Sequence, residues 1–229
     1  GIGRDISDII YIPFMNYTKS VFNKIFFGDL VARYSIRNDM ALKVLIRKLA
    51  ESVKQPSSFT RLANLVSSTG KKITTDTIID YLNYLEDTWI LFPLENYVSK
   101  LADKVSNKKF YFMDNGILSL FLMDPETSLL ENLVAVTLKK RYGDGLYFYH
   151  RNIEVDFYLD EAHKAIQVSY SLKDPETRKR EVNALLKLAE NVAVDDLCII
   201  TRDEEEMIVE GEKTIRVVPV WRWLLDDEE

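Results

Sequence analysis

The chain has 229 residues, and 30 Lys and Arg against 36 Asp and Glu give it a formal net charge of −6. Hydrophobic residues make up 47% of it, with only 8 Gly and 6 Pro, which excludes a disordered or collagen-like chain and is typical of a compact soluble protein. No apolar run approaches the length of a membrane span and no signal peptide opens the chain, so we expect a cytoplasmic protein with no membrane contact.

Charge is distributed unevenly along the chain. The residues before Phe110 include 16 basic and 11 acidic side chains, whereas those from Phe110 onward include 14 basic and 25 acidic side chains. A polar stretch over 99–109 lies at the change of sign. We therefore predict two domains, one over 1–104 and one over 105–229.

Helical spacing of apolar residues dominates the first half. It predicts helices over 17–33 and 40–53, and a short third helix after the capping residues Ser57 and Ser58. Thr74 or Thr75 then caps a helix that runs to Asp87, and 89–94 has the composition of a strand. Helix, helix, turn, helix and strand in this order indicate a winged-helix module.

The second half has strand spacing interrupted by helices. It predicts helices over 128–141 and 175–191, the second with Pro175 in its first turn. The predicted strands cover 109–113, 146–150, 153–159, 165–170, 197–201 and 215–220. The fold class is therefore α/β (α+β overall), with a helical module followed by a mixed-sheet domain.

Two carboxylates share one face of the predicted strand 153–159, because side chains alternate along a strand and Glu154 and Asp156 are two residues apart. Gln167 on the next strand and Glu131 on the preceding helix can join Asp156. Oxygen ligands of this kind suit Mg²⁺, which positions nucleophiles in phosphodiester hydrolysis. The same pattern also fits a solvent-facing strand and a buried, hydrogen-bonded Gln167.

The motif order resembles that of a known superfamily. Glu131, then Glu154-Val155-Asp156-Phe157, then Gln167-Val168-Ser169 is similar to the restriction-endonuclease-like (PD-(D/E)XK) motif. The strings Phe110-Tyr111-Phe112-Met113-Asp114-Asn115-Gly116 and Leu130-Glu131-Asn132 resemble the C-terminal region, a domain of unknown function, of prokaryotic AAA+-type ATPases. Asp29 to Tyr34 and Tyr81 to Asp87 are similar to helical and winged-helix segments of that family, so the resemblance covers about residues 20 to 200.

Two departures from the family follow. Its full-length members carry a P-loop domain, and this sequence has no P-loop pattern, so ATP is expected only in a missing N-terminal ATPase domain, which would be a partner of this chain. The motif lysine would occupy position 169, which is Ser169. Losing such a charge costs about 2.7 to 4 kcal/mol, by analogy with a lost oxyanion donor. Lys173, or Arg178 or Lys179, is the expected substitute.

The predicted helix 75–87 has acidic residues off its apolar face and no Lys or Arg, so we do not expect it to read DNA bases. Contact with a DNA backbone is expected instead from basic residues elsewhere in the first half. These are Arg33, Arg37, Arg47, Lys71 and Lys72.

Three functions fit these observations. The first is a noncatalytic accessory region of an AAA+-like ATPase that binds a protein partner or nucleic acid and carries a degenerate nuclease-like domain. The second is a Mg²⁺-dependent nuclease with Glu131, Asp156 and Gln167 as catalytic and metal-binding groups and Lys173 or Lys179 as the added cation. The third is a structural or oligomerisation module.

Overall fold

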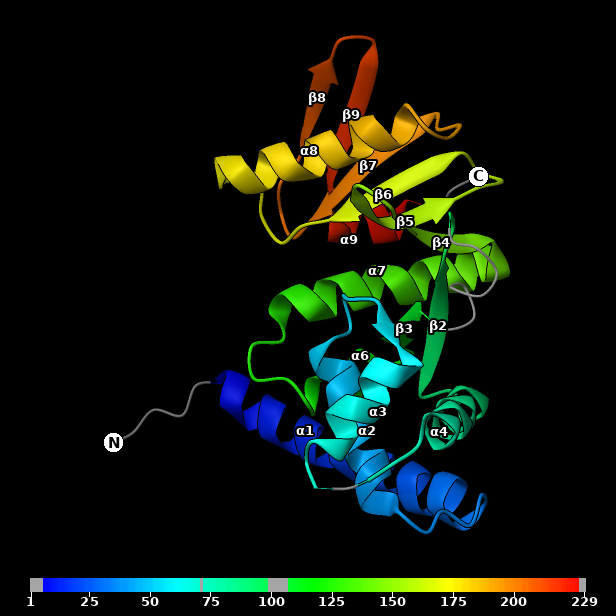
Figure 1. Ribbon diagram of the computed structural model, residues 1–229. Helices are drawn as coiled ribbons and strands as arrows, with labels where there is room; N and C mark the ends of the chain where they lie inside the picture. Colours follow the sequence, from blue (N-terminus) through cyan, green and yellow to red (C-terminus); the bar gives the residue numbers. More distant parts are fainter. Residues whose placement is uncertain (1–5, 71, 99–106, 227–229) are drawn as a thin grey trace. The chain divides into compact units, whose positions relative to one another are not determined.

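The computed structural model describes residues 6–70, 72–98 and 107–226 of the chain (Figure 1). The fold is α+β with a mixed sheet, which confirms the predicted class. Two compact units form, one from Gly1–Pro93 with Phe110–Pro125 (unit 1) and one from Leu94–Lys109 with Glu126–Glu229 (unit 2). The domain boundary predicted between residues 104 and 105 lies outside the described residues.

Unit 1 is mainly helical. It begins with α1 (Ile6–Lys24), which continues as a π-helical segment, η1 (Ile25–Ala32). The elements that follow are α2 (Asp39–Glu51), β1 (Ser57–Ser58), α3 (Phe59–Ser67), α4 (Thr75–Asp87) and α6 (Asn115–Ser119). Strands β2 (Leu91–Asn96) and β3 (Asn107–Phe112) pass between the units.

The helices of unit 1 begin where the sequence places capping side chains. Ser58 Oγ accepts a hydrogen bond from the Arg61 backbone N at the start of α3, and Thr74 Oγ1 accepts one from the Thr77 backbone N at the start of α4. These contacts satisfy backbone donors that have no partner within the helix. The predicted starts of both helices are confirmed.

The turn after α4 differs from the prediction. Trp89 was expected in a strand, but it has φ +57° and lies in a turn closed by the hydrogen bond from Ile90 N to Leu85 O. A residue in this left-handed region commonly ends a helix. Strand β2 therefore begins two residues later than predicted, at Leu91.

Unit 2 contains most of the sheet. The strand order is β1-β3-β2-β4-β5-β6-β7-β9-β8. Its own strands are β4 (Leu146–His150), β5 (Glu154–Leu159), β6 (Lys164–Val168), β7 (Asp196–Thr201), β8 (Glu206–Glu210) and β9 (Lys213–Pro219). Strand β5 is antiparallel to β4 and β6, β7 is parallel to β6 and β9, and β8 is antiparallel to β9.

Three helices pack on this sheet: α7 (Glu126–Tyr142), α8 (Pro175–Ala189) and α9 (Val220–Leu225). Figure 1 shows α8 on one side of the strands and α7 and α9 on the other. Pro175 is in the first turn of α8, where a residue needs no backbone N–H to donate within the helix. Asp174 caps the helix. Leu185 and Leu188 of α8 join the core with Ile199 and Val217 of the sheet, all at most 1% exposed.

Two elements of unit 2 were not predicted. Strand β8 is a short edge strand joined to β9 by a tight turn in which Gly211 has φ +63°. Helix α9 follows Pro219, and only its first residue, Val220, falls within the predicted strand 215–220. Both segments are too short for a periodic pattern to separate helix from strand.

Candidate functional site

A buried ammonium group lies among three carboxylates in unit 2. Lys109, near the middle of β3, has a side chain with no solvent exposure. Its Nζ is 2.9 Å from Glu154 Oε1, 3.4 Å from Asp156 Oδ1 and 3.9 Å from Glu131 Oε1. These four residues, with Gln167 and Glu181, are called the Lys109 cluster below.

Electrostatics keep Lys109 charged in this position. Burial alone would lower its pKa, because removing water disfavours the charged form. The negative charges of Asp156, Glu131 and Glu154 outweigh burial and raise the pKa above its ordinary value. A charge this deeply buried is tolerated only with such partners.

Gln167 joins the ends of two strands. The paired registers of β5 and β6 run from Phe157 with Ile166 to Leu159 with Lys164. Beyond them, Gln167 Oε1 accepts a hydrogen bond of 2.8 Å from the Asp156 backbone N, and its Nε2 donates one of 3.2 Å to the Glu154 backbone O. A side-chain amide thus takes over the role of ladder hydrogen bonds at this end of the sheet.

Asp156 makes the reciprocal contact. Its Oδ2 accepts a hydrogen bond of 2.9 Å from the Val168 backbone N, while its Oδ1 faces Lys109 Nζ. Both carboxylate oxygens therefore have a partner within the protein. Asp156 and Gln167 together hold β5 and β6 in register beside the buried ammonium group.

Glu181 of α8 completes the cluster from the helix side. Its Oε2 accepts a hydrogen bond of 2.7 Å from Gln167 Nε2, and its Oε1 pairs with Arg180 at 2.6 Å. Burial raises the pKa of Glu181, the charge of Asp156 raises it further, and Arg180 opposes the shift. This carboxyl group is therefore easier to protonate than an ordinary glutamate.

The structure brings Glu131, Asp156 and Gln167 to one place, as the sequence predicted. They do not surround an open position, because Glu131 and Asp156 both face the ammonium of Lys109 and the Gln167 amide is used by the neighbouring strand and helix. No group of three or more His, Cys, Asp or Glu side chains in the described part of the chain is arranged to hold a metal ion. In this arrangement Glu131 and Asp156 face an ammonium group.

The structure does not bring Lys173 to the cluster. Lys173 is exposed in the segment between β6 and α8, and Ser171 and Leu172 just before it are held by Glu204 through hydrogen bonds of 2.6 and 3.1 Å. Arg178 pairs with Glu206, and Lys179 is exposed.

The ammonium group that faces Asp156 Oδ1 belongs to Lys109 of β3 instead. The sequence did contain a signal for Lys109, because a lysine stands at the start of the predicted apolar strand 109–113.

The basic residues predicted to contact DNA lie in different settings. Arg33 is exposed, with its guanidinium 5.9 Å from the centre of the Tyr34 ring, and Arg47 pairs with Glu51 at 3.8 Å. Arg37 and Lys72 line one surface pocket together with the first turn of α4. Lys71 lies outside the described residues.

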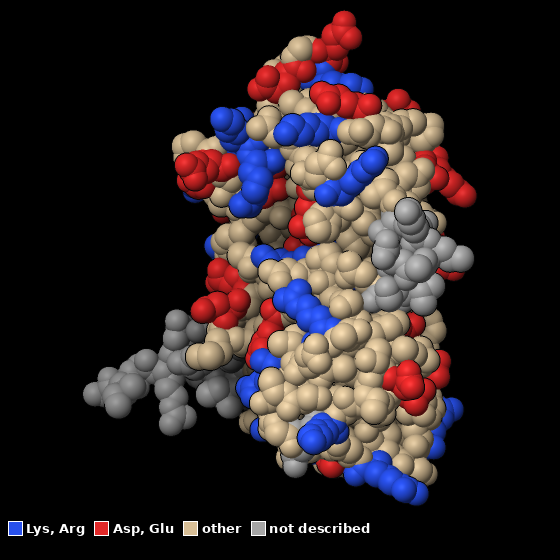
Figure 2. All heavy atoms as spheres, viewed as in Figure 1, with Lys and Arg blue, Asp and Glu red and all other residues tan. Residues whose placement is uncertain are grey.

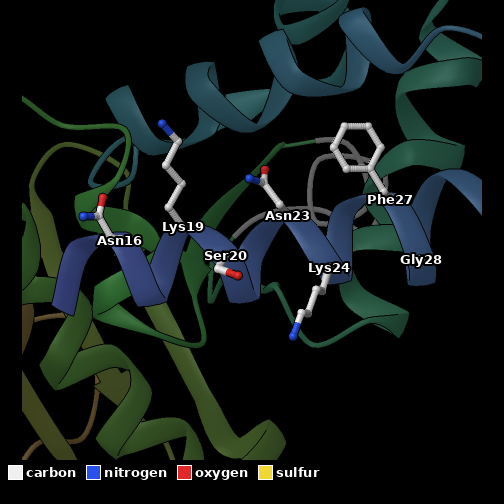
Figure 3. Close-up of a pocket in the computed structure, with 7 residues that line it drawn as sticks. All are labelled: Asn16, Lys19, Ser20, Asn23, Lys24, Phe27 and Gly28. Carbon is white, nitrogen blue, oxygen red and sulfur yellow. The ribbon is translucent and has the colours of Figure 1, made fainter. Parts of the chain in front are cut away.

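A second polar pocket of unit 1 lies along α1 and η1 (Figure 3). Lys19, Asn23 and Phe27 point to one side of the helix, whereas Lys24 points to the other side. The two ammonium groups therefore do not converge on one anion. In the face shown in Figure 2, basic and acidic side chains are interspersed rather than gathered into a patch of one sign.

No helix in the described ranges is both long and apolar enough to cross a membrane. No solved structure matches the chain.

Two curated relatives are similar to most of the chain. An uncharacterized protein of Methanocaldococcus jannaschii is 33% identical over 219 residues, which are 90% of this chain and 49% of that protein. An uncharacterized protein of Haemophilus influenzae is 24% identical over 209 residues, 90% of this chain and 51% of that protein. The chain thus spans about half the length of these relatives.

A family described as "Domain of unknown function (DUF8612)" matches residues 14–128. This range ends close to Pro125, where unit 1 ends, and it includes both strands that pass between the units. It contains Lys109 but none of the carboxylates around it. Since the match covers half of the chain, the protein belongs to the DUF8612 family.

Proposed function

We propose that this chain is a noncatalytic accessory region of an AAA+-like ATPase. In this proposal unit 1 contains a winged-helix module that contacts a nucleic-acid backbone, and unit 2 is a degenerate restriction-endonuclease-like domain. The observation that carries the noncatalytic assignment is the position of Lys109, whose ammonium lies within 4 Å of three carboxylates. This ammonium group neutralises the negative charge of the carboxylates, which a metal ion would otherwise balance.

The winged-helix assignment is supported by the order of elements. Helix α2, strand β1, helices α3 and α4 and strands β2 and β3 follow one another, and the three strands lie in the order β1-β3-β2. The exposed side of α4 is acidic, which disfavours insertion into DNA. Arg37 and Lys72 instead offer two cations next to the first turn of α4, where backbone N–H groups favour a phosphate.

The link to an ATPase is supported by the resemblance of the chain and by the length of its relatives, about half of which lies outside the matched region. In the proposal this additional part binds ATP and is the partner of the chain. Measuring ATP hydrolysis by the full-length protein, with and without DNA, tests this part directly. A full-length protein without ATPase activity would contradict it.

Cleavage assays test the noncatalytic assignment. Labelled single-stranded, double-stranded and branched DNA and RNA are incubated with the protein and Mg²⁺ or Mn²⁺, beside the Asp156→Ala variant as a control for contaminating nucleases. We expect no cleavage that depends on Asp156. Cleavage by the unaltered protein that is lost in Asp156→Ala would overturn the assignment.

Binding assays test the nucleic-acid contact. The affinity for a DNA duplex is measured over a range of salt concentrations, and each lost phosphate contact lowers the slope of log affinity against log salt by about 1. We expect this change for Arg37→Gln and Lys72→Gln but not for Lys213→Gln, an exposed lysine of unit 2. Equal effects of all three variants would indicate only a general loss of charge. No binding and no cleavage would favour a structural module.

The second candidate is a Mg²⁺-dependent nuclease, favoured by one observation. Lys109 Nζ lies 3.4 Å from Asp156 Oδ1 and could supply the positive charge that Ser169 lacks. In that case Lys109→Met abolishes Asp156-dependent cleavage while the protein stays folded. Under the first proposal, the Lys109→Met and Asp156→Ala variants cleave no more nucleic acid than the unaltered protein, which is itself inactive.

A further inference from the structure

Strand β8 is an open edge of the sheet (Figure 1). It pairs with β9 from Glu206 with Val217 to Glu210 with Lys213, without a shift of register. The strand at the other edge, β1, has only two residues. Proteins commonly protect an edge by keeping it very short or by placing a bulge or a proline in it. Strand β8, whose residues are all described, has none of these protections.

The outward backbone groups of β8 belong to Met207 and Val209. The two-residue turn at 211–212 closes the hairpin at the pair of Glu210 and Lys213, so this pair exchanges hydrogen bonds. Hydrogen-bonded pairs alternate from there, and Met207 and Val209 therefore direct their N–H and C=O groups away from β9. Within the described ranges, no strand pairs with β8 on this side.

The two faces of β8 differ. Ile208 packs in the core beneath α8 and Glu206 pairs with Arg178 of α8, so this set of alternate residues faces that helix. Met207 and Val209 face the opposite way, and they are 61% and 67% exposed. The residues with outward backbone groups thus also carry exposed apolar side chains, which an added strand would cover.

Negative charge around the edge determines which partner fits. Six of the ten residues over 203–212 are acidic and none is basic. Glu206 and Glu210 lie on the α8 side of the strand, and Glu210 forms no ion pair in the described part of the chain. Side chains of an added strand would lie beside these two residues, where basic groups are attracted and acidic groups are repelled.

A second copy of this chain does not suit the edge. In the antiparallel register that sets Met207 opposite Val209 of the second copy, Glu206 lies opposite Glu210 of the second copy, and the same pair recurs by symmetry. Like charges directly opposite each other destabilise a sheet. The acidic residues therefore protect the edge against self-association but not against a basic strand.

We propose that β8 binds an extended segment of another protein, in which basic and apolar residues alternate, as an added antiparallel strand. The backbone of this segment pairs with the outward groups of Met207 and Val209, and its apolar side chains cover these two residues. Its lysines or arginines lie beside Glu206 and Glu210. The interaction is independent of the function proposed for the Lys109 cluster.

The test uses the intact chain and two peptides with blocked termini. One alternates lysine and valine, and the other has glutamate in place of lysine. Binding is followed by isothermal titration calorimetry and by amide hydrogen exchange at Met207 and Val209. We expect the lysine peptide to slow exchange at both amides and to bind at least about tenfold more tightly than the glutamate peptide. No saturable binding of the lysine peptide, or binding without protection of these amides, overturns the proposal.

Methylated peptides separate strand pairing from attraction between charges. In the antiparallel arrangement the valines opposite Met207 and Val209 donate their N–H groups to β8, whereas the lysine N–H groups point away from it. N-methylation of the valines should therefore weaken binding at least about tenfold, and N-methylation of the lysines should have a much smaller effect. Equal effects would show that charge alone holds the peptide and would contradict the proposal.

Variants of the chain assign the contacts. Val209→Pro removes an outward N–H that β9 does not use, and it should abolish binding of the lysine peptide. Glu210→Lys should weaken the lysine peptide and strengthen the glutamate peptide, unlike the matched control Glu161→Lys, at an exposed position between β5 and β6. A control effect as large as that of Glu210→Lys contradicts the proposal. If Val209→Pro fails to fold, the methylated peptides decide the question on the unaltered chain.

Two further results would assign the edge to another occupant. Dimers of the unaltered chain in sedimentation experiments that are lost in Val209→Pro would overturn the proposal in favour of a second copy. A full-length protein that fails to bind the peptide bound by this chain would show that another segment of the same protein covers β8, which also overturns it.

Discussion

Lys109 shows how a single residue sets the character of its surroundings. An ammonium group with no solvent exposure is stable only because three carboxylates lie within 4 Å of it. The same carboxylates depend on Lys109, since without it Glu131, Glu154 and Asp156 would repel one another. The stability of this region should therefore respond far more to Lys109 than to a neighbouring surface lysine.

Lys109→Met should lower the free energy of unfolding by about 3 to 5 kcal/mol, because it leaves the buried Glu131 and the mostly buried Asp156 without their cation. The matched control is Lys108→Met, which removes an ion pair of 3.6 Å with Glu95 at a side chain that is 20% exposed. The control should cost no more than about 1 kcal/mol. Urea unfolding at neutral pH measures both, and equal losses would contradict the role assigned to Lys109.

Glu181 gives the cluster a pH dependence. Its pKa in the folded protein is raised above the ordinary 4.5, so the folded state binds its proton more tightly than the unfolded state does. Stability from this group is therefore fully present below about pH 4.5 and is lost as the pH rises through the folded pKa. Glu181→Gln stays neutral and still accepts the hydrogen bond from Gln167, so it should lack this loss.

Urea unfolding of the unaltered protein and of Glu181→Gln from about pH 4 to about pH 8 tests the sign. The stability of the variant relative to the unaltered protein should increase with pH. Glu176→Gln, at an exposed position in the first turn of the same helix, should not reproduce this increase. A relative stability of Glu181→Gln that falls with pH would show that the pKa is lowered instead.

Sequence reasoning located part of this site. Glu131, Asp156 and Gln167 were found from the spacing of polar residues on predicted elements and from a family resemblance. Lys109 was missed, because its contacts join strands that are far apart in the sequence. Alternation along one strand describes which side chains share a face, but it carries no information about which distant strand supplies their counter-charge.

At the scale of elements, the junction of β5 and β6 is the unusual feature. Beyond the pairing of Phe157 with Ile166, the link between the strands comes from the Gln167 amide and the Asp156 carboxylate. Side chains can reproduce ladder hydrogen bonds only while they are themselves held in place. Glu181 holds Gln167 in this case.

Gln167→Met should lower stability by about 2 kcal/mol or more, because the Asp156 N–H and the Glu154 carbonyl lose their partners with little change in side-chain shape. Amide hydrogen exchange at Asp156 should become faster. Gln55→Met, at an exposed position, should leave both stability and exchange unchanged. Unchanged protection of the Asp156 amide in Gln167→Met would show that β5 and β6 are held together by other contacts.

Elements with clear caps and long periodic patterns were predicted well, and short ones were not. Helix α4 begins after Thr74 and α8 has Pro175 in its first turn, as expected. Strand β8 has five residues with Met207 and Val209 exposed, so its apolar pattern does not mark a buried face. Gly211 in the turn to β9 was a usable signal for this hairpin.

At the scale of the whole molecule, the two units exchange segments of chain. Unit 1 needs residues 110–125 to complete its core, since the Phe121 ring packs on Phe22 at 5.3 Å and on Phe112 at 6.4 Å. Helix α6 also approaches α1 closely, and a methyl group at Gly116 would lie 3.3 Å from Thr18. Patterns along the sequence suggest a linear division and give no sign of this exchange.

A fragment of residues 1–125 should therefore unfold cooperatively on heating, whereas one of residues 1–104 should be much less stable. Loss of Phe110 and Phe112 alone removes two buried aromatic side chains, each worth about 3 to 5 kcal/mol. Circular dichroism melting curves of the two fragments test this expectation. Equal midpoints would show that the first 104 residues form a complete core.

The exchange of segments has a consequence for synthesis on the ribosome. Lys109 is made before any of the carboxylates that surround it, and the last of them, Asp156, follows 47 residues later in the printed sequence. At about 5 to 20 residues per second, the interval is roughly 2 to 9 s. During that time residues 110–125 can pack into the core of unit 1 while the Lys109 side chain is still hydrated. The order of translation therefore favours assembly of the helical core before the buried ion cluster.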